Sequence, residues 1–410
     1  MDDIIYLTYP LLLLALLAGA KFAGRGSYNP EFMSLKNTKY IQGFFAICVM
    51  LHHMGQKTCA SWHDPKYIVH GLDMFVGIGY LFVAIFFFYS GYGLFVSFKN
   101  KPDYLHGFVK HRIIPIIIAF YMAQLIFLPA RYLLGEKIST RQLLYYLTGA
   151  QLCNINTWFP IAIVAFYFAF YFSFKYIKNE NLAIFATFLA VFAWTFIGTC
   201  INHNDWWMRG EWWYNSVHTF WMGLVFAKFK KPITEGIKKH YFIYLILAIV
   251  LFYASWKLCV FVQNGAFGFS YYCETSWGPK GPYATPLLVK LYKKWGVLAA
   301  QILYSTLFLV VVLLISMKVQ VGNKVLAFMG KITLEFYLVH SLFVEMFGYT
   351  FADSLHPVYY IKNVALFAVV VIACSIPATL LFKRVLQLLT LFCRKERVEK
   401  KDYKAKVSLD

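Results

Sequence analysis

Apolar segments long enough to cross a lipid bilayer recur along the whole of this chain. A helix needs about 20 apolar residues to cross the hydrocarbon core, and only helices and closed barrels satisfy their backbone polar groups there. The segments are too long and too continuous for barrel strands. We therefore predict an all-α polytopic membrane protein with about 11 transmembrane helices, at residues 4–20, 39–55, 74–97, 113–134, 158–174, 182–200, 213–227, 241–262, 295–316, 325–347 and 361–382.

The composition agrees with this class. Hydrophobic residues make up 60% of the 410 residues and charged residues only 14%, whereas a soluble domain carries about 25% charged residues. The eight cysteines form no C-x-x-C pair and no metal-ligand spacing, so we predict neither a metal site nor a disulfide framework. A bridge between Cys59 and Cys273, both in predicted outer loops, stays open. The acidic start, Met1-Asp2-Asp3, argues against a cleavable signal peptide.

The net charge of +20 is unevenly distributed between alternate connections. One set of connections, with the C-terminal tail, carries 24 basic residues, and the opposite set carries 9. Because cytoplasmic connections carry the excess of Lys and Arg, we predict a cell-membrane protein with its N-terminus outside and its C-terminus in the cytoplasm. The basic tail, 387–410, is either an orientation signal alone, which we favour, or a contact with anionic lipid headgroups. Neither interpretation involves nucleic acid.

The segment from Lys39 to Met54 carries the first candidate site. A histidine at the lip of a membrane span is costly to bury, so His52 and His53 are functional candidates, with polar contact to a neighbouring helix as the alternative. Gln42 and His53 are eleven residues apart, about three helical turns, and therefore lie on one face roughly 16 Å apart. His52 points about 100° away and is the second choice.

Polar groups in the next two helices are further candidates. Ser90 and Tyr92 offer hydroxyls to the bundle interior, and the glycines beside them are explained by close helix packing. Lys110 and Arg112 stand where a helix begins at the cytoplasmic lip, and a guanidinium suits a phosphate there. Topology and snorkelling would also place an arginine at this position.

The predicted span 325–347 contains three ionisable residues, Lys331, Glu335 and His340. Three such residues in one membrane helix are too costly to face lipid, so we expect them to line an interior or a cavity. Lys331 and Glu335 are four residues apart and could pair along one helix face. His340 lies towards the outer half, at a depth comparable with that of His53.

Aromatic residues gather in the predicted outer loops, where residues 205–214 read DWWMRGEWWY. Membrane interfaces attract such rings, but exposed rings such as that of Trp212 are also platforms for stacking on sugars. The loop 154–160 (NINTWFP) is a candidate re-entrant or capping element, and the long loop 263–294 is a candidate lid.

Several short motifs follow one another in a fixed order. Gln42 and His53 are separated by ten residues, Ser90-Gly91-Tyr92 lies in the next helix, and Arg112 comes shortly before Pro115. Further blocks are Trp158-Phe159, residues 221–227 (WMGLVFA) and residues 330–340 (GKITLEFYLVH). In this order the motifs resemble the membrane-bound acyltransferase 3 family over about residues 36–386. That family has a basic residue at the position of Gln42 and an additional arginine at the position of Val109.

The resemblance implies a domain organisation and a set of site residues. It implies a ten-helix acyltransferase domain at 36–386, preceded by an extra N-terminal helix in 1–35 and followed by the basic tail. His53 would be the catalytic base or would carry the acyl group, with His52, Ser90 and Tyr92 as further catalytic candidates. Acyl-coenzyme A would be the donor, held by Lys39, Gln42, Lys110, Arg112 and Lys331. Substrate-binding candidates are Trp158, Trp212, Glu335 and His340.

The function that the resemblance implies is transfer of an acyl group, most simply acetyl, from cytoplasmic acyl-coenzyme A to a hydroxyl. The acceptor would be an extracellular or lipid-linked glycan or another component of the cell envelope, and no cofactor would be permanently bound. Two alternatives stay open. One is a proton-coupled transporter or flippase of an envelope precursor that relays protons through its histidines. The other is an acyltransferase-like protein with altered catalysis, because Gln42 replaces the family's basic residue.

Overall fold

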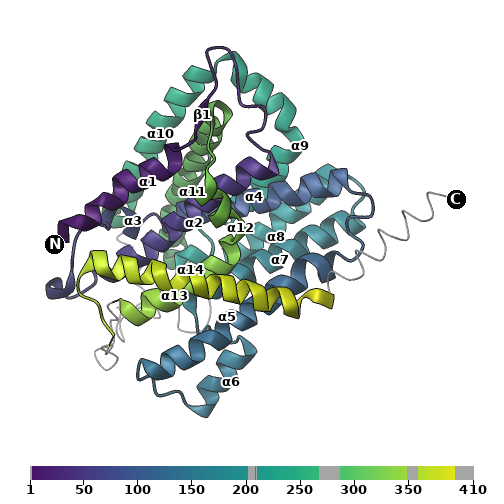
Figure 1. Ribbon diagram of the computed structural model, residues 1–410. Helices are drawn as coiled ribbons and strands as arrows, with labels where there is room; N and C mark the ends of the chain where they lie inside the picture. Colours follow the sequence, from purple (N-terminus) through teal and green to yellow (C-terminus); the bar gives the residue numbers. More distant parts are fainter. Residues whose placement is uncertain (1, 202–207, 209, 267–286, 349–358, 393–410) are drawn as a thin grey trace.

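A computed structural model of the chain describes residues 2–201, 208, 210–266, 287–348 and 359–392 (Figure 1). These residues are almost entirely helical, and the strands among them form one two-stranded pair. The predicted all-α polytopic class is confirmed. Three predictions concern residues outside the described part of the chain: the Cys273 partner of Cys59, the centre of the candidate lid at 267–286, and residues 393–410 of the tail.

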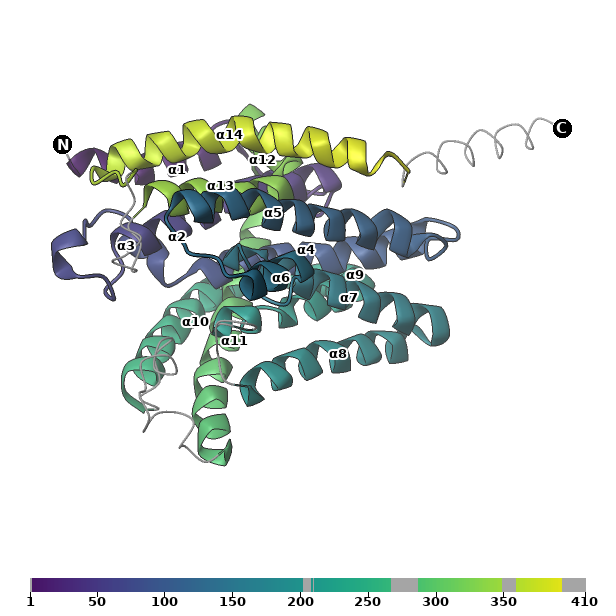
Figure 2. The same cartoon turned by 90° about the horizontal axis from the view of Figure 1, so that it is seen from below.

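The described part of the chain contains fourteen α-helices. The α-helices are α1 (Thr8–Leu17), α2 (Leu35–Thr58), α3 (Asp73–Val76), α4 (Gly79–Asn100), α5 (Ile114–Leu133), α6 (Thr140–Thr148), α7 (Trp158–Tyr176), α8 (Glu180–Cys200), α9 (His218–Lys239), α10 (Tyr241–Phe261), α11 (Leu287–Lys318), α12 (Lys324–Lys331), α13 (Thr333–Phe347) and α14 (Val364–Leu389). Short 3₁₀ helices occur at Asp2–Leu7, Pro65–Tyr67, Ile155–Thr157 and Glu211–Trp213, π-turns at Val109–Ile113 and Val262–Ala266, and strands at β1 (Lys21–Phe22) and β2 (Val319–Gln320). Figure 2 shows α14 along one edge of the bundle, α2, α4 and α5 through its middle, and α8 with α10 and α11 towards the opposite edge.

Seven helices in the described part of the chain are long and apolar enough to cross a membrane, namely α4, α5, α7, α8, α10, α11 and α14. The pair α12 and α13 would make an eighth, but the two helices meet at a bend of 86°. The predicted single span 325–347 is therefore wrong as one continuous helix, because Ile332 ends α12 outside the helical conformation. The other predicted spans are α1, with only 10 residues, α2, with many polar side chains, and α9, kinked at Phe229.

Helices α4 and α9 cross at a pair of glycines. A Cβ atom on Gly91 would lie 2.0 Å from the carbonyl oxygen of Phe220, and one on Gly223 would lie 2.2 Å from that of Phe88. Only glycine permits this approach, which is the usual way that membrane helices gain close backbone packing. The crossing confirms that packing explains Gly91, but the same prediction is wrong for Gly93, where a Cβ atom would meet nothing within 4 Å. Ser90 precedes Gly91 and lies about 100° around α4 from it, so the two residues face different neighbours.

Helices α2 and α12 cross in the same way at the start of α2. A Cβ atom on Gly43 would lie 2.5 Å from the carbonyl oxygen of Leu326, and one on Gly330 would lie 2.2 Å from that of Lys39. The bend after α12 then directs α13 along α2. This pair of helices brings residues that are almost 300 positions apart in the sequence into contact.

The N-terminal segment packs on the outside of this crossing. The side-chain amide of Asn323 donates hydrogen bonds to the carbonyl oxygens of Ala15 (2.7 Å) and Ala18 (3.0 Å) in and after α1. Strands β1 and β2 pair antiparallel, with Lys21 opposite Gln320. The segment that precedes α2 is therefore attached to the connection between α11 and α12.

Candidate active site

A cavity of about 200 Å³ lies inside the bundle between α2, α4, α5, α7 and α13. Its walls are mostly apolar, with a few polar side chains among them, as is typical of small-molecule sites. Its polar lining residues are Lys39, Gln42, Ser90, Tyr167, Thr333 and Tyr337. Its apolar lining residues are Ala46, Val49, Val83, Phe86, Ile116, Phe159, Ile163 and Leu334. Three residues chosen from the sequence, Lys39, Gln42 and Ser90, are thus brought together in one cavity.

The cavity follows one face of α2. Lys39, Gln42, Ala46 and Val49 all line it, and their spacing of three to four residues is that of successive helical turns. From Lys39 to Val49 the helix rises about 15 Å. The next residue on this face is His53, one turn beyond Val49. The cavity therefore leads from the lysine at the beginning of α2 towards the histidine near its end.

His53 lies beside the far end of this cavity. Its ring centroid is 6.3 Å from that of Tyr337, which lines the cavity, and 5.0 Å from that of His340. Nδ1 of His53 is 2.8 Å from Nε2 of His340, and the two rings are within 11° of parallel. His340 is completely buried, whereas His53 is half-buried. The sequence placed the two histidines at comparable depth but did not predict their contact.

A buried polar network holds α13 where it carries His340. The side-chain amide of Asn154 donates to the carbonyl oxygen of Leu338 (3.2 Å), and the hydroxyl of Ser341 donates to the Asn154 side-chain oxygen (3.4 Å). Oε1 of Gln124 in α5 accepts hydrogen bonds from the Asn154 backbone amide (3.0 Å) and the Thr157 hydroxyl (3.1 Å). The loop 154–160 is thus a capping element, since Asn154 also caps the short helix Ile155–Thr157.

The other two catalytic candidates lie away from the cavity. Nδ1 of His52 is 2.7 Å from the carbonyl oxygen of Phe75, and its ring is packed against Gly79 at the start of α4. Tyr92 is buried on the α9 side of α4, with its ring 6.2 Å from that of Phe226. Ser90 and Tyr92 are two residues apart, about 200° around the helix, so only one of them can face the cavity.

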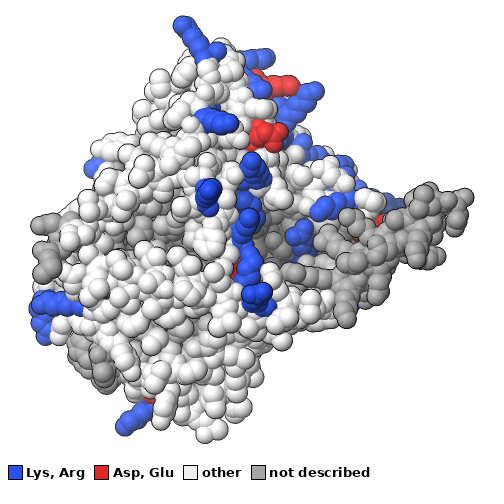
Figure 3. Space-filling view, in the orientation of Figure 1, with Lys and Arg blue, Asp and Glu red and all other residues white. Residues whose placement is uncertain are grey.

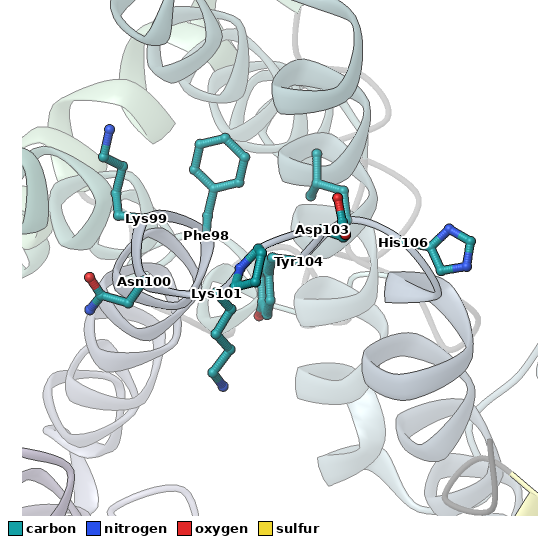
Figure 4. Close-up of a pocket in the computed structure, with 9 residues that line it drawn as sticks. Phe98, Lys99, Asn100, Lys101, Asp103, Tyr104 and His106 are labelled. Carbon is teal, nitrogen blue, oxygen red and sulfur yellow. The ribbon is translucent and has the colours of Figure 1, made fainter. Parts of the chain in front are cut away.

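The basic candidates near the start of α5 do not line the cavity. Arg112 is about one helical turn before Ile116, which lines the cavity, and its guanidinium lies 5.8 Å from the ring centroid of Tyr104. Lys110 is in the same π-turn. A larger hollow of about 570 Å³ follows the preceding turn, residues 98–106. Figure 4 shows Lys99, Asn100, Lys101 and His106 directed to different sides of this turn, so their side chains do not form a convergent site.

The bend between α12 and α13 separates the charged residues that the sequence placed in one span. Lys331 is exposed on α12, next to the crossing of Gly330 with Lys39. Glu335 is half-buried on α13 and lies 3.8 Å from Nζ of Lys383 in α14, so its ion-pair partner is Lys383 instead of the predicted Lys331. Of the three residues, His340 alone is fully buried.

The tryptophan candidates do not line the cavity. Trp158 is buried with its ring 6.0 Å from that of Trp213, whereas the adjacent Phe159 lines the cavity and lies 5.6 Å from Tyr337. Trp212 is half-buried in the short helix Glu211–Trp213. A role of Trp158 or Trp212 in substrate binding stays a prediction.

Sequence reasoning missed the aromatic residues that complete the cavity, Tyr167, Phe159 and Tyr337. Apolar spans rich in aromatic residues give no signal for which ring faces inward. Tyr337 was the exception that could have been found, because it is three residues before His340 and therefore on nearly the same helix face. Among the described residues, no group of three or more His, Cys, Asp or Glu gathers to form a metal site.

A family profile matches the part of the chain that forms the cavity. No curated protein and no solved structure matches the chain. A family profile described as an acyltransferase domain, acyltransferase 3, matches residues 36–384, which include every residue that lines the cavity as well as His53 and His340. The match covers most of the chain, and the chain therefore belongs to the acyltransferase 3 family of multi-pass membrane proteins.

Proposed function

We propose that this protein transfers an acyl group, most simply acetyl, from cytoplasmic acyl-coenzyme A to a hydroxyl of an extracellular or lipid-linked glycan of the cell envelope. The observation that carries the proposal is the cavity that joins the start of α2, at Lys39 and Gln42, to the turn below His53. Such a cavity allows a donor held at one side of the membrane to present its acyl group near the other side.

The donor would enter at the Lys39 end. Lys39 offers a positive charge and Gln42 a hydrogen-bonding amide at the mouth, and Arg112 with Lys110 lies about one turn outside it. Guanidinium and ammonium groups suit the phosphates of coenzyme A, which would stay in the aqueous phase. The apolar walls between Lys39 and Val49 suit the extended pantetheine arm, which is flexible and largely uncharged.

The chemistry would take place at His53. As the acceptor hydroxyl oxygen attacks the thioester carbonyl carbon, His53 takes the hydroxyl proton, the carbon–sulfur bond breaks and coenzyme A leaves as the thiolate. The hydroxyl of Tyr337, whose ring lies next to His53 in the cavity lining, is a candidate to donate a hydrogen bond to the developing oxyanion. Ser90 lies about 16 Å further along α4 than Gly79, which packs against His52, so its hydroxyl would meet the donor nearer to Lys39. In the alternative route, His53 itself attacks the carbonyl carbon, the carbon–sulfur bond breaks and coenzyme A leaves as the thiolate. The acceptor hydroxyl oxygen then attacks the acyl-histidine, the bond to the ring nitrogen breaks, and the hydroxyl proton passes to the released imidazole.

The distribution of charge supports the proposed orientation. Figure 3 shows Lys and Arg side chains forming a band on one face of the molecule, with few acidic side chains. Lys66, Lys137 and Arg141 are exposed in the opposite set of connections. The exposed basic residues in connections that the sequence assigns to the cytoplasm include Lys21, Arg25, Lys36, Lys231, Lys238, Lys239 and Lys324. With this face in the cytoplasm, Lys39 lies at the inner side of the membrane and His53 towards the outer side.

The first test is His53→Ala in purified protein, with radiolabelled acetyl-coenzyme A as donor. We expect the rate of acyl transfer, or of donor hydrolysis if no acceptor is supplied, to fall by about 10²–10⁴-fold, as when a general base is removed. His240→Ala is the matched control because His240 is exposed at the connection between α9 and α10. Unchanged transfer by folded His53→Ala protein would exclude His53 from the mechanism.

The second test closes the cavity without touching the histidines. Ile116→Trp places a bulky ring in the cavity wall, whereas Leu125→Trp places the same ring at a position on the same helix that is 51% exposed. We expect Ile116→Trp to weaken acetyl-coenzyme A binding strongly and Leu125→Trp to leave it unchanged. If wild-type protein neither binds nor hydrolyses acetyl-coenzyme A but moves a glycan precursor across proteoliposomes, the transporter alternative is correct.

A further inference from the structure

We infer that His340 fixes which ring nitrogen of His53 carries the proton, and that it is a positioning residue for His53 instead of a substrate-binding residue. The inference rests on the function proposed for His53. It depends on a chain of two hydrogen bonds that begins at a backbone carbonyl group in α13 and ends at His53.

The first hydrogen bond determines the tautomer of His340. Nδ1 of His340 lies 2.7 Å from the carbonyl oxygen of Phe336. A carbonyl oxygen can only accept, so Nδ1 of His340 carries the proton and donates it. A neutral imidazole has one N–H group, and Nε2 of His340 is therefore an acceptor. The buried position of His340 favours this neutral form, because a charged ring would be costly there.

The second hydrogen bond determines the tautomer of His53. Nδ1 of His53 is 2.8 Å from Nε2 of His340, so one of these two nitrogens must carry a proton. Nε2 of His340 is already the acceptor, and Nδ1 of His53 is therefore the donor. It follows that Nε2 of His53 is left with its lone pair. This nitrogen can accept a proton or attack a carbonyl carbon, as either route requires.

The arrangement serves the purpose that a carboxylate or carbonyl group serves behind many catalytic histidines, which is to hold the ring and select its tautomer. Here His340 lies between the Phe336 carbonyl group and His53. The carbonyl group fixes the tautomer of His340, and His340 in turn fixes that of His53 across the contact between α2 and α13. His52 provides the contrast within the same helix. Its Nδ1 also meets a carbonyl oxygen, that of Phe75, but its Nε2 is packed against Gly79 and not beside the cavity.

A purely structural role for His340 leads to a different expectation. If the pair only joined α2 to α13, loss of the hydrogen bond would lower the stability and leave the turnover of folded protein unchanged. If His340 positions His53, turnover falls while donor binding stays the same. A separation of kcat from KM therefore distinguishes the two roles.

The test compares His340→Phe with His340→Gln. Phenylalanine keeps a planar ring but offers no acceptor, whereas the glutamine side-chain oxygen can accept a hydrogen bond near the original position of Nε2. We expect His340→Phe to lower kcat by about 10²–10³-fold with the KM for acetyl-coenzyme A unchanged. His340→Gln should retain at least about ten times the turnover of His340→Phe. Val344→Ala is the packing control, because Val344 is buried one turn further along α13 and has no polar side-chain group.

A second measurement does not depend on acyl transfer. Diethyl pyrocarbonate modifies a histidine nitrogen that carries a lone pair, and mass spectrometry can follow its addition to His53. Nδ1 of His53 faces residue 340 across the contact of α2 with α13, so we expect the reagent to reach a lone pair on Nε2 and not one on Nδ1. We expect this modification to be several-fold slower in His340→Phe than in wild-type protein and close to the wild-type rate in His340→Gln. The rate of modification reports the tautomer of His53 without any acyl transfer. It therefore tests the inference even if His53→Ala retains acyl transfer and the proposed function is wrong. Wild-type kcat together with wild-type modification of His53 in His340→Phe would overturn the inference.

Discussion

The crossing of α4 with α9 gives the sharpest mechanical prediction. In Gly91→Ala, the new Cβ atom would lie 2.0 Å from the carbonyl oxygen of Phe220, and this distance must increase by about 1 Å before it reaches even a tight contact. Forcing an additional methyl group into a packed interface costs about 1–3 kcal/mol. Gly93→Ala is the matched control on the same helix, because a Cβ atom there would meet nothing within 4 Å.

The two variants share the gain in helix propensity of alanine over glycine, about 1 kcal/mol. Their difference in stability therefore measures the crossing alone. We expect Gly91→Ala to be about 1–3 kcal/mol less stable than Gly93→Ala in thermal or chemical unfolding of the detergent-solubilised protein. Because Ser90 is adjacent and lines the cavity, a shift of about 1 Å should also lower acyl transfer, by up to about 10²-fold. Equal stability of the two variants would show that the crossing does not limit the approach of α4 to α9.

Three further outcomes are expected. Gln42→Leu removes a polar group from the cavity mouth and should raise the KM for acetyl-coenzyme A with little effect on thermal stability, as titration of the donor will show. Asn323→Ala removes two hydrogen bonds to the α1 segment and the cap of α12, and should lower the unfolding free energy by about 1–3 kcal/mol while transfer by folded protein persists. Partial burial acts to raise the pKa of Asp73, but the Gly71 amide and the His70 ring outweigh it and lower the pKa. This stabilisation is present above the unfolded pKa of about 4 and is lost as the pH falls through the folded value, so Asp73→Asn should lower stability at neutral pH and flatten its acid dependence in unfolding measured against pH.

Several features of the site followed from the sequence because they depend only on local spacing. Lys39, Gln42 and His53 are on one face of α2, since helical periodicity fixes the direction of each side chain. The order of the family blocks across the chain identified the acyltransferase 3 family, and the family profile confirmed it. The orientation in the membrane, the acceptor and the donor stay proposals that rest on charge distribution and cavity shape.

Other features could not follow from the sequence because α4 is apolar on every face. Ser90 and Tyr92 were equal candidates until the glycine crossing showed which face of α4 meets α9 and which meets the cavity. The bend after α12 was likewise hidden, because the run from Lys324 to Phe347 is hydrophobic enough overall to be predicted as one span and contains no proline. An apolar side chain is equally suited to contact with lipid and to contact with another helix. Hydropathy therefore does not show which face of a helix meets lipid and which meets protein.

The sequence by itself determined that this protein is a helical membrane protein with a histidine at the end of its second helix, because apolar length and polar exceptions are properties of a single segment. Only the tertiary structure decided that His53 meets His340, 287 residues away, beside a cavity that begins at Lys39. Contacts between helices depend on which faces meet and how closely their backbones approach. In this protein a few glycines and the bend between α12 and α13 determine which faces meet and how closely. Their effect becomes visible only when the helices are packed together.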